Sequence, residues 1–387
     1  MHSQRTMQQS TQKQDKLLFT PGPLTTSPSV KQAALRDLGS RDHEFIAMVR
    51  DIRRKLLELG GVADRGFEAI LMQGSGTFAI ESVLSSTVPP DGKVLAVING
   101  AYGRRIAQIA RALKIPVTEL ACPEDQRPDT EQLSRALQAD PSITHVAVVH
   151  SETSTGMINP VREIGEIVKR FSRTYLVDAM SSFGGMPLNH LDCGIDYLVS
   201  SANKCLEGIP GFAFVLARRA ALLATAGFAR SVCLDLLAQW KGLEADGQFR
   251  FTPPTHALLA FHQALRELEA EGGVEARAAR YRTNFQILSE GMGELGFEGF
   301  LRPEDRGYII SSFHYPRHPK FDFGTFYARL SDKGYVIYPG KVSKADCFRI
   351  GCIGHIFPDD MRGLLGAIRQ TLAEMGVKMP AAVSESP

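Results

Sequence analysis

Between residues 67 and 217 the sequence alternates short apolar runs with amphipathic stretches, and this pattern restricts the chain to few architectures. The stretches over 77–88 and 102–113 have helical periodicity. The strand-like apolar runs cover 67–73, 94–99, 145–150, 174–178, 197–200 and 211–217. Strands that alternate with helices predict a mainly parallel sheet covered on both faces, an α/β fold. Ligands of such sheets bind at the carboxyl ends of the strands, so the residues after each strand are the candidates for a site.

A chain of 387 residues is too long for one hydrophobic core, so we expect two domains. The alternating pattern changes after residue 260, and the segments that follow predict a smaller α/β domain. We expect a large domain over 41–265 and a small C-terminal domain over 266–378. A segment over 17–40 is expected to pack on the small domain. Polar tails are expected over 1–16, which we predict to be disordered, and over 379–387.

The composition excludes several classes of function. The formal net charge is +2 and 22% of the residues are charged, which provides no long-range field for a nucleic acid or a membrane surface. No apolar run approaches the roughly 20 residues that cross a bilayer. The six cysteines lack the paired spacing of a metal site. We therefore expect a cytoplasmic protein with reduced thiols and no metal, whose partner is a small molecule.

The segment Gln73-Gly74-Ser75-Gly76-Thr77 joins a predicted strand to a predicted helix. Its glycines allow the backbone to approach an anion, and the start of the helix supplies unpaired N–H groups. A Gly/Ser turn that caps a helix is also a common structural feature. Next to a cofactor site, Ser75, Gly76 and Thr77 become a candidate cradle for a phosphate.

An acidic residue and a lysine follow two further strands. Asp178 ends the strand over 174–178, and Lys204 lies in a Ser/Asn/Gly-rich turn after the strand over 197–200. Such a lysine can form a Schiff base with pyridoxal 5′-phosphate (PLP), and such a carboxylate can keep the pyridinium nitrogen of that cofactor protonated. The small residues around Lys204 are unusual for an exposed lysine. The pair predicts a PLP site in which Lys204 and Asp178 are catalytic.

Other residues near predicted strand ends extend this site. Tyr102 offers a flat apolar face that can stack on the cofactor ring, and Thr155 lies in a hydroxyl-rich loop from which it can bind the phenolic oxygen. Glu152, in the same loop, has no assigned role beyond orienting the loop. Thr255 follows two prolines and is expected to be the N-cap of a helix, or alternatively a second phosphate contact.

Arg349 lies within a strand-like apolar run of the predicted small domain. A buried arginine needs an anionic partner, and its planar guanidinium suits a carboxylate or a phosphonate. We therefore expect Arg349 to anchor an anionic substrate.

With these segments, the sequence resembles the class V, fold-type I PLP-dependent aminotransferases, in the branch that acts on 2-aminoethylphosphonate and pyruvate. The residues beside the lysine are the specific part, since Ala202-Asn203-Lys204-Cys205 stands where class V glyoxylate aminotransferases tend to have Ser-Gln-Lys. The chain departs from the expected pattern at Ser151, usually Cys, and at Cys352, usually Asn. The resemblance covers residues 17–375, and it is carried by 18–26, 72–78, 99–105, 178–185, 201–205 and 338–341.

The resemblance implies a fold-type I transferase with a large PLP-binding domain and a ping-pong transamination. In that reaction 2-aminoethylphosphonate and pyruvate become phosphonoacetaldehyde and L-alanine, a step of phosphonate catabolism. Lys204 would be the Schiff-base lysine and proton shuttle, and Arg349 would bind the substrate anion. Family members are homodimers with shared sites, so Thr255 would reach the phosphate in the neighbouring subunit. The implied cofactor-binding residues are Ser75, Gly76, Thr77, Tyr102, Thr155, Asp178, Lys204 and Thr255.

Three other interpretations stay open. A class V alanine– or serine–glyoxylate aminotransferase would share the cofactor chemistry and use a different amino donor. A cysteine desulfurase of this fold needs a nucleophilic cysteine on a mobile loop, for which Cys347 and Cys352 are the small-domain candidates. A non-catalytic partner subunit would bind the cofactor without turnover, and the intact pair of Lys204 and Asp178 argues against it.

Overall fold

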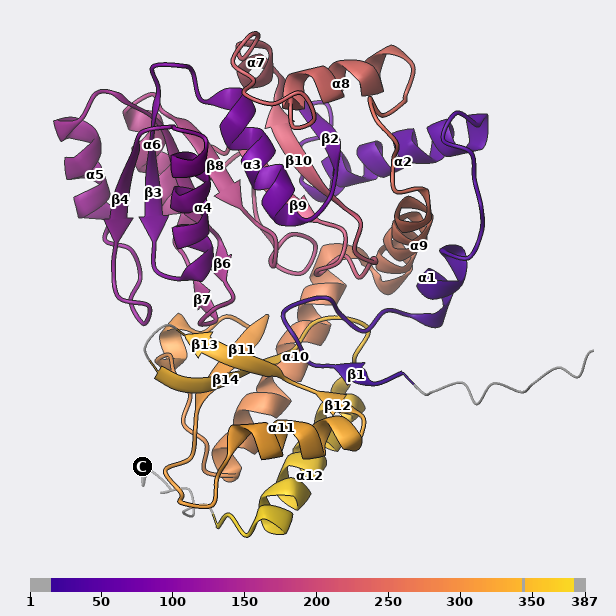
Figure 1. Ribbon diagram of the computed structural model, residues 1–387, viewed down its shortest axis with the longest axis vertical. Helices are drawn as coiled ribbons and strands as arrows, with labels where there is room; N and C mark the ends of the chain where they lie inside the picture. Colours follow the sequence, from indigo (N-terminus) through magenta and orange to yellow (C-terminus); the bar gives the residue numbers. More distant parts are fainter. Residues whose placement is uncertain (1–14, 343–344, 379–387) are drawn as a thin grey trace, which may run out of the picture.

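The computed structural model describes residues 15–342 and 345–378, and its larger lobe is built around a seven-stranded sheet (Figure 1). The strands are β2 (Phe67–Gln73), β3 (Lys93–Ile98), β4 (Val117–Ala121), β5 (Ile143–Val149), β8 (Thr174–Asp178), β9 (Tyr197–Ser201) and β10 (Phe212–Arg218). Their order in the sheet is β2-β10-β9-β8-β5-β3-β4. Neighbours are parallel except at β10, which is antiparallel to both β2 and β9. The prediction of a mainly parallel sheet is confirmed.

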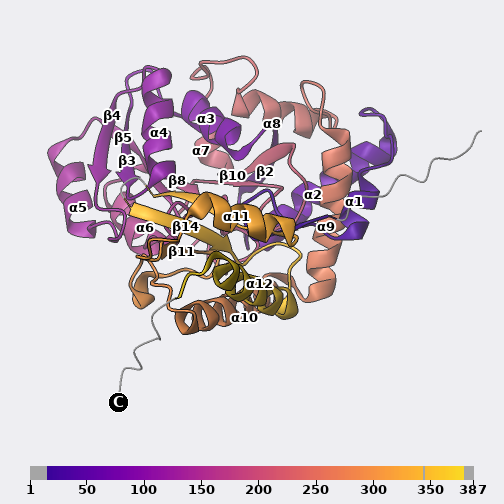
Figure 2. The ribbon, with the colours of Figure 1, turned by 60° about the horizontal axis from the view of Figure 1, so that its bottom comes forward.

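Helices cover both faces of this sheet (Figure 2). They are amphipathic, as in the helix over 101–112, where Ile106 and Ile109 are buried while Arg104 and Arg111 face solvent. One apolar core extends through this lobe from Phe45 to Leu268. The helices are α2 (His43–Leu59), α3 (Gly76–Thr87), α4 (Ala101–Ala112), α5 (Thr130–Ala139), α6 (Val161–Arg170), α7 (Arg219–Leu223), α8 (Leu236–Ala245) and α9 (Thr255–Glu271).

The smaller lobe has a separate core, which centres on Phe348 and Phe326 and includes Phe19 from the start of the chain. Its elements are α10 (Gly273–Glu294), the short 3-10 helix η1 (Pro303–Asp305), β11 (Ile310–His314), α11 (Phe323–Asp332), β12 (Tyr335–Val336), β13 (Tyr338–Val342), β14 (Ala345–Gly351) and α12 (Pro358–Met375). A three-stranded antiparallel sheet in the order β11-β14-β13 lies against these helices.

Two features of this lobe differ from the sequence-based expectation. The stretch over 335–338 predicts one short strand, but it belongs to two strands in different sheets, β12 and β13, with the buried Ile337 between them. The arginine-rich sequence over 273–294 did not predict a helix, but it forms α10. Its apolar periodicity is interrupted by Arg277, a charged residue that is nevertheless buried.

The N-terminal segment contacts both lobes. Its strand β1 (Leu17–Leu18) pairs in parallel with β12 of the small lobe. Its helix α1 (Pro28–Ala33) places Val30 against Ala260 and Ala264 of α9. The predicted tails fall outside the described residues, except for residues 15 and 16. The domain boundaries given above stay a prediction.

The sheet brings its carboxyl edge to the small lobe (Figure 1). Parallel pairing aligns Val149 of β5 with Asp178 of β8, and Asp178 with Val199 of β9. The residues that follow these strands therefore meet at one edge. The chain after β5 forms a two-stranded hairpin of β6 (Ser151–Glu152) and β7 (Met157–Ile158). Within the described ranges, we find no helix long and apolar enough to cross a membrane.

Candidate active site

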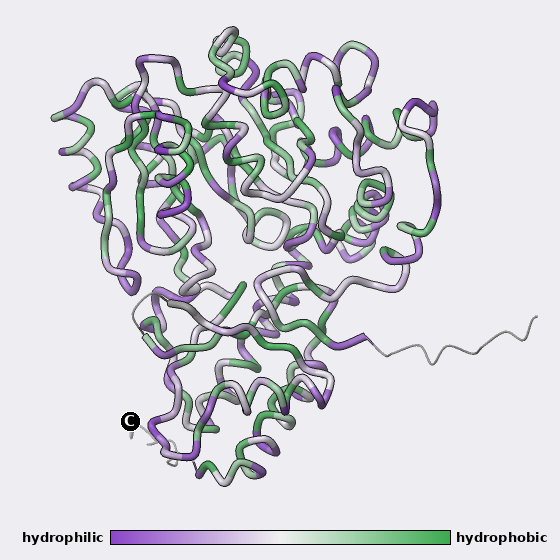
Figure 3. The backbone as a smooth tube through the Cα atoms, in the orientation of Figure 1, coloured by the Kyte–Doolittle hydropathy of each residue, from purple (hydrophilic) through white to green (hydrophobic). Residues whose placement is uncertain are grey.

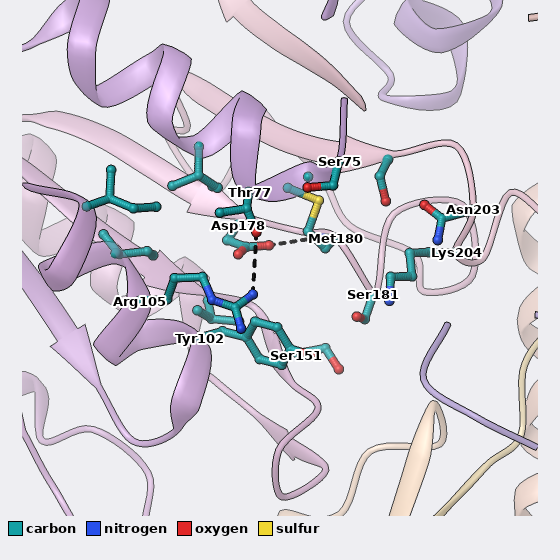
Figure 4. A pocket seen from close by; sticks show the side chains of 16 residues that line it. Ser75, Thr77, Tyr102, Arg105, Ser151, Asp178, Met180, Ser181, Asn203 and Lys204 are labelled. Atoms are coloured by element: carbon teal, nitrogen blue, oxygen red, sulfur yellow. Dashed lines mark hydrogen bonds between the residues drawn. The ribbon is translucent and has the colours of Figure 1, made fainter. Parts of the chain in front are cut away.

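A cavity of about 280 Å³ opens at the carboxyl edge of the sheet (Figure 4). Its walls come from segments far apart in the sequence: the start of α3, the start of α4, and the ends of β5, β8 and β9. The lining residues are Ser75, Gly76, Thr77, Ile80, Tyr102, Arg105, Ile106, Ile109, Val149, Ser151, Asp178, Met180, Ser181, Ser201, Asn203 and Lys204. The cavity therefore brings together six of the predicted residues: Ser75, Gly76, Thr77, Tyr102, Asp178 and Lys204. Thr155, Thr255 and Arg349 do not line it.

Asp178 and Lys204 lie on the same cavity wall without bonding to each other. The Asp178 carboxylate accepts a hydrogen bond from the N–H of Met180 at 2.9 Å, and burial raises the pKa of this carboxyl to about 7. Lys204 Nζ donates to the carbonyl oxygen of Pro21 at 2.6 Å, and burial lowers the pKa of this amine to about 8. An aromatic group between them, with a protonated ring nitrogen at Asp178 and an aldehyde carbon at Lys204, would suit both side chains. PLP has these two features.

The start of α3 is open toward the cavity. Ser75 is the N-cap of the helix, but its side chain makes no capping hydrogen bond. A Cβ at Gly76 would lie 2.3 Å from Met180 Sδ, so glycine is required for this close approach. The first N–H groups of a helix bind phosphate well, and the hydroxyls of Ser75 and Thr77 lie beside them. The donor set therefore fits the phosphate of PLP.

The start of α4, in contrast, is closed by Glu152. Its Oε2 accepts from the N–H groups of Tyr102 at 3.2 Å and Gly103 at 3.3 Å, and its Oε1 accepts from the Ser154 hydroxyl at 2.5 Å. Burial raises the pKa of Glu152, and these hydrogen bonds oppose that effect. Glu152 thus orients more than its own loop, because it caps α4 and fixes the position at which Tyr102 enters the cavity.

Several lining residues were missed by the sequence analysis. Met180 lies two residues after Asp178, and Figure 4 shows it on the opposite side of the cavity from Tyr102. Arg105 lies one helical turn after Tyr102, with its guanidinium carbon 5.0 Å from the centroid of the Tyr102 ring. Arg105 Nη1 donates to Thr77 Oγ1 at 3.4 Å. A spacing of three residues in a helix predicts this shared face and could have identified Arg105.

Neither Thr155 nor Thr255 lines this cavity, and their contacts to the cofactor stay predictions. The Thr155 hydroxyl turns back to its own loop, where it donates to the carbonyl of Glu152 and accepts from the N–H of Met157, both at 3.3 Å. The expectation that Thr255 is an N-cap is wrong, since α9 begins at Thr255 and Pro254 is the N-cap. Pro254 has no N–H and a φ of −79°, which suits the residue before a helix, so the helix starts at Thr255, one residue earlier than expected.

Arg349 is buried on β14, the central strand of the small-lobe sheet. Its Nη1 donates to the carbonyl of Thr153 at 2.7 Å and its Nη2 to that of Pro339 at 3.2 Å. The guanidinium stacks on Tyr338, 4.7 Å from the ring centroid. Among the described residues Arg349 Nε has no hydrogen-bond partner although it is buried. Burial lowers the pKa of this group, and an anion at Nε would offset that effect.

The fold and the cavity together are those of a fold-type I, PLP-dependent aminotransferase. The family model described as aminotransferase class-V matches residues 26–331. Over 361 residues the chain is 51% identical to the 2-aminoethylphosphonate–pyruvate transaminase of Syntrophobacter fumaroxidans, with coverage of 93% of this chain and 97% of the relative. Over 354 residues it is 52% identical to the transaminase of the same name from Klebsiella pneumoniae, with coverage of 91% and 96%. The chain therefore belongs to the class V aminotransferases, in the family of the 2-aminoethylphosphonate–pyruvate transaminases.

Solved structures agree with this assignment. The alanine–glyoxylate aminotransferase from Nostoc sp. superposes with a TM-score of 0.86 at 26% identity, covering 95% of this chain and 98% of the other. The pyridoxamine–pyruvate aminotransferase from Mesorhizobium loti also gives a TM-score of 0.86, at 24% identity and with coverage of 96% and 95%. The predicted fold class is confirmed by these similarities.

Proposed function

We propose that this protein transfers the amino group of 2-aminoethylphosphonate to pyruvate, giving phosphonoacetaldehyde and L-alanine. The observation that carries the proposal is the identity of 51% and 52% with transaminases of that name over more than nine-tenths of both chains. The cavity supports it, because Lys204, Asp178 and the open start of α3 meet there in the arrangement that PLP needs. The glyoxylate alternative is not favoured by these relatives.

Each lining group then has a physical task. PLP, when bound, supplies an electron sink for the bond that breaks at the carbon bearing the amino group. Asp178 would keep the ring nitrogen protonated, and Tyr102 and Met180, which line the cavity, would hold the ring. Because burial lowers the pKa of Lys204 to about 8, its amine gives up its proton near neutral pH far more readily than an ordinary lysine does. The neutral amine can take a proton from the substrate carbon and return it.

Arg349 is proposed to hold the anionic end of both substrates in turn. Its two terminal nitrogens are already held by backbone carbonyls, which keep the guanidinium in a defined plane. The unpaired Nε supplies a donor for an incoming oxygen. The same group can thus serve a phosphonate in one half-reaction and a carboxylate in the other.

The proposal is tested by presenting the purified PLP-bound protein with 2-aminoethylphosphonate, alanine and serine separately and following the visible absorbance of the cofactor. We expect 2-aminoethylphosphonate to bleach the band and pyruvate to restore it. Lys204→Ala, the control, should lack both responses. Bleaching by serine but not by the phosphonate would contradict the proposed donor, and no bleaching by any amine would favour a non-catalytic subunit.

The desulfurase alternative finds no support in the small-lobe cysteines. Cys347 lies in β14 and Cys352 just after it, and both are buried rather than placed on a mobile loop. Burial raises the pKa of Cys347 to about 11 and raises that of Cys352 as well. Both thiols therefore stay protonated and are poor nucleophiles near neutral pH.

We further propose that the protein is a cytoplasmic homodimer in which each subunit completes the site of its partner. Two exposed aromatic side chains support the dimer: Phe78, which directly follows the cavity-lining Thr77, is 53% exposed, and Phe251 is 44% exposed. The two are linked through the turn after β2, since Phe78 packs over Gly74 and the side chain of Gln73 donates to the carbonyl of Phe251. Thr255 follows Phe251 closely in the sequence, and from there it would reach the phosphate bound by the second subunit.

A further inference from the structure

The turn that carries Lys204 rests on a cluster of buried charges outside the cavity. Glu207, in this turn, is 3% exposed, and its φ of 58° is a conformation that residues with a Cβ seldom adopt. Its Oε1 accepts hydrogen bonds from the Tyr281 hydroxyl at 2.6 Å and from Arg280 Nη2 at 2.8 Å. Both donors belong to α10, the long helix that runs from the large lobe into the small lobe (Figure 1).

A second set of bonds holds the backbone of the same turn. Arg277, 1% exposed, donates from Nη1 to the carbonyl of Cys205 at 2.7 Å. Glu271, at the end of α9, accepts from Arg277 Nε at 2.6 Å and from Arg280 Nε at 2.8 Å. Two carboxylates and two guanidinium groups therefore balance each other in the interior. We call Glu207, Glu271, Arg277, Arg280 and Tyr281 the Glu207 cluster.

The Glu207 cluster also binds the small lobe. Arg280 Nη1 donates to the carbonyls of Gly354 at 2.7 Å and Ile356 at 3.0 Å. Asn284, one turn further along α10, donates to the carbonyls of Cys352 at 3.2 Å and Ile356 at 3.1 Å. This segment directly follows β14, the strand that carries Arg349.

We propose that Glu207 and Arg280 are positioning residues that set the spacing between Lys204 and Arg349. The inference rests on the proposed function, in which Lys204 acts at the amine end of the substrate and Arg349 binds its anionic end. A hydrogen-bonded charge cluster around the buried Glu207 and Arg277 resists deformation, because separating these groups from their partners leaves an uncompensated charge in the interior. A substrate of fixed length requires a fixed distance between the groups that hold its two ends.

The test is hydrogen–deuterium exchange of the cofactor-free protein, which does not depend on any substrate. Glu207→Gln removes one charge and keeps the side-chain size. We expect exchange at least about tenfold faster in two separate segments, 204–211 and 352–357. Glu68→Gln is the matched control, because Glu68 is also buried and pairs with Arg219 at the far end of β2. Faster exchange in 204–211 alone, or equal changes in both variants, would overturn the link.

Two further measurements keep the test decisive. Tyr281→Phe removes no charge. It removes the hydroxyl that donates to Glu207 and to the Cys205 carbonyl and accepts from the Gly354 N–H, so it breaks the same link by another route if Glu207→Gln does not fold; the same two segments should again exchange faster. In the holoenzyme, Glu207→Gln should lower kcat about tenfold and change KM less than about threefold, because the anion still binds while the lysine is misplaced. A fall in kcat with unchanged exchange would overturn the proposal. The expected exchange pattern in a protein inactive on 2-aminoethylphosphonate would overturn only the proposed function.

Discussion

Arg105 lines the cavity and brings a positive charge to it. Its charge lies beside Thr77 at the open start of α3. It lowers the pKa of Lys204, as burial does more strongly, and it lowers the pKa of Asp178 against the larger effect of burial, which raises it. Its neighbour Arg104 points away and pairs with Glu124. The two arginines therefore form a matched pair in which only one faces the cavity.

We expect Arg105→Gln to weaken PLP binding by on the order of tenfold, because a charge-assisted contact to the phosphate is lost. Pyridoxal, which lacks the phosphate, should bind almost as before, and Arg104→Gln should change neither affinity. Equilibrium titration of the cofactor-free protein with both compounds provides the comparison. An equal loss for both would place Arg105 at the ring rather than at the phosphate.

The amine of Lys204 should titrate well below an ordinary lysine. Because an amine reacts only when neutral, competitive acetylation of the cofactor-free protein should reach half its maximal rate at Lys204 near pH 8. A free lysine derivative in the same mixture titrates at about 10.4. Asp178 raises the pKa of Lys204, so Asp178→Asn should move the midpoint to lower pH. A midpoint that moves upward, or stays near that of the free derivative, would contradict this electrostatic picture.

At the scale of elements, the N-terminal segment forms part of the site. Gly22 has a φ of 123°, and a Cβ there would lie 2.5 Å from Lys204 Nζ. The lysine also donates to Pro21 in the same segment. The chain before the first strand of the large sheet is thus what covers the reactive amine.

Gly22→Ala should displace Lys204 and lower transamination by roughly tenfold or more, since overpacking of this kind costs about 1–3 kcal/mol. Gly61→Ala is the control, because Gly61 also has a positive φ but open space around its Cα. Thermal unfolding should show a loss of about 1 kcal/mol in Gly61→Ala, from its positive φ alone, and a larger loss in Gly22→Ala, where the overpacking is added. Equal activity in the two variants would show that Lys204 accommodates the added methyl group.

The elements themselves were the most predictable part of the molecule. The strands β2 and β8 have the predicted bounds, because strands that are buried on both faces are nearly continuous apolar runs between polar turns. The helix α10 was missed, because its buried Arg277 interrupts the apolar pattern and donates to the carbonyl of Cys205, which lies far away in the sequence. The hydropathy pattern contains no sign of such partners.

At the scale of the whole molecule, the exposed side chains of Phe78 and Phe251 are the proposed contact between subunits. We expect the protein to sediment as a dimer, and the double variant Phe78→Ser, Phe251→Ser to sediment as a monomer with weaker PLP binding. Leu223→Ser is the control, since Leu223 is 48% exposed in α7, beyond the other end of β10. A double variant that remains dimeric with full PLP affinity would place the interface elsewhere. Figure 3 shows the hydropathy of each residue along the backbone.

The sequence by itself determined the fold class, the strand ends and the residue types of the chemistry. Lys204, Asp178, Tyr102 and the segment 75–77 were identifiable because parallel strands place the residues after them at a common edge, whatever the details of packing. These features are local: each depends on a short stretch of sequence and on the order of the strands.

Only the tertiary structure decided how those residues are held. Glu152 caps a helix from a different segment, Pro21 accepts from Lys204, and Glu207 joins the lysine turn to α10. Each of these contacts joins segments separated by tens of residues or more, and nothing in the separate stretches predicts which polar groups will meet. A buried polar group must find a partner, but the fold selects that partner.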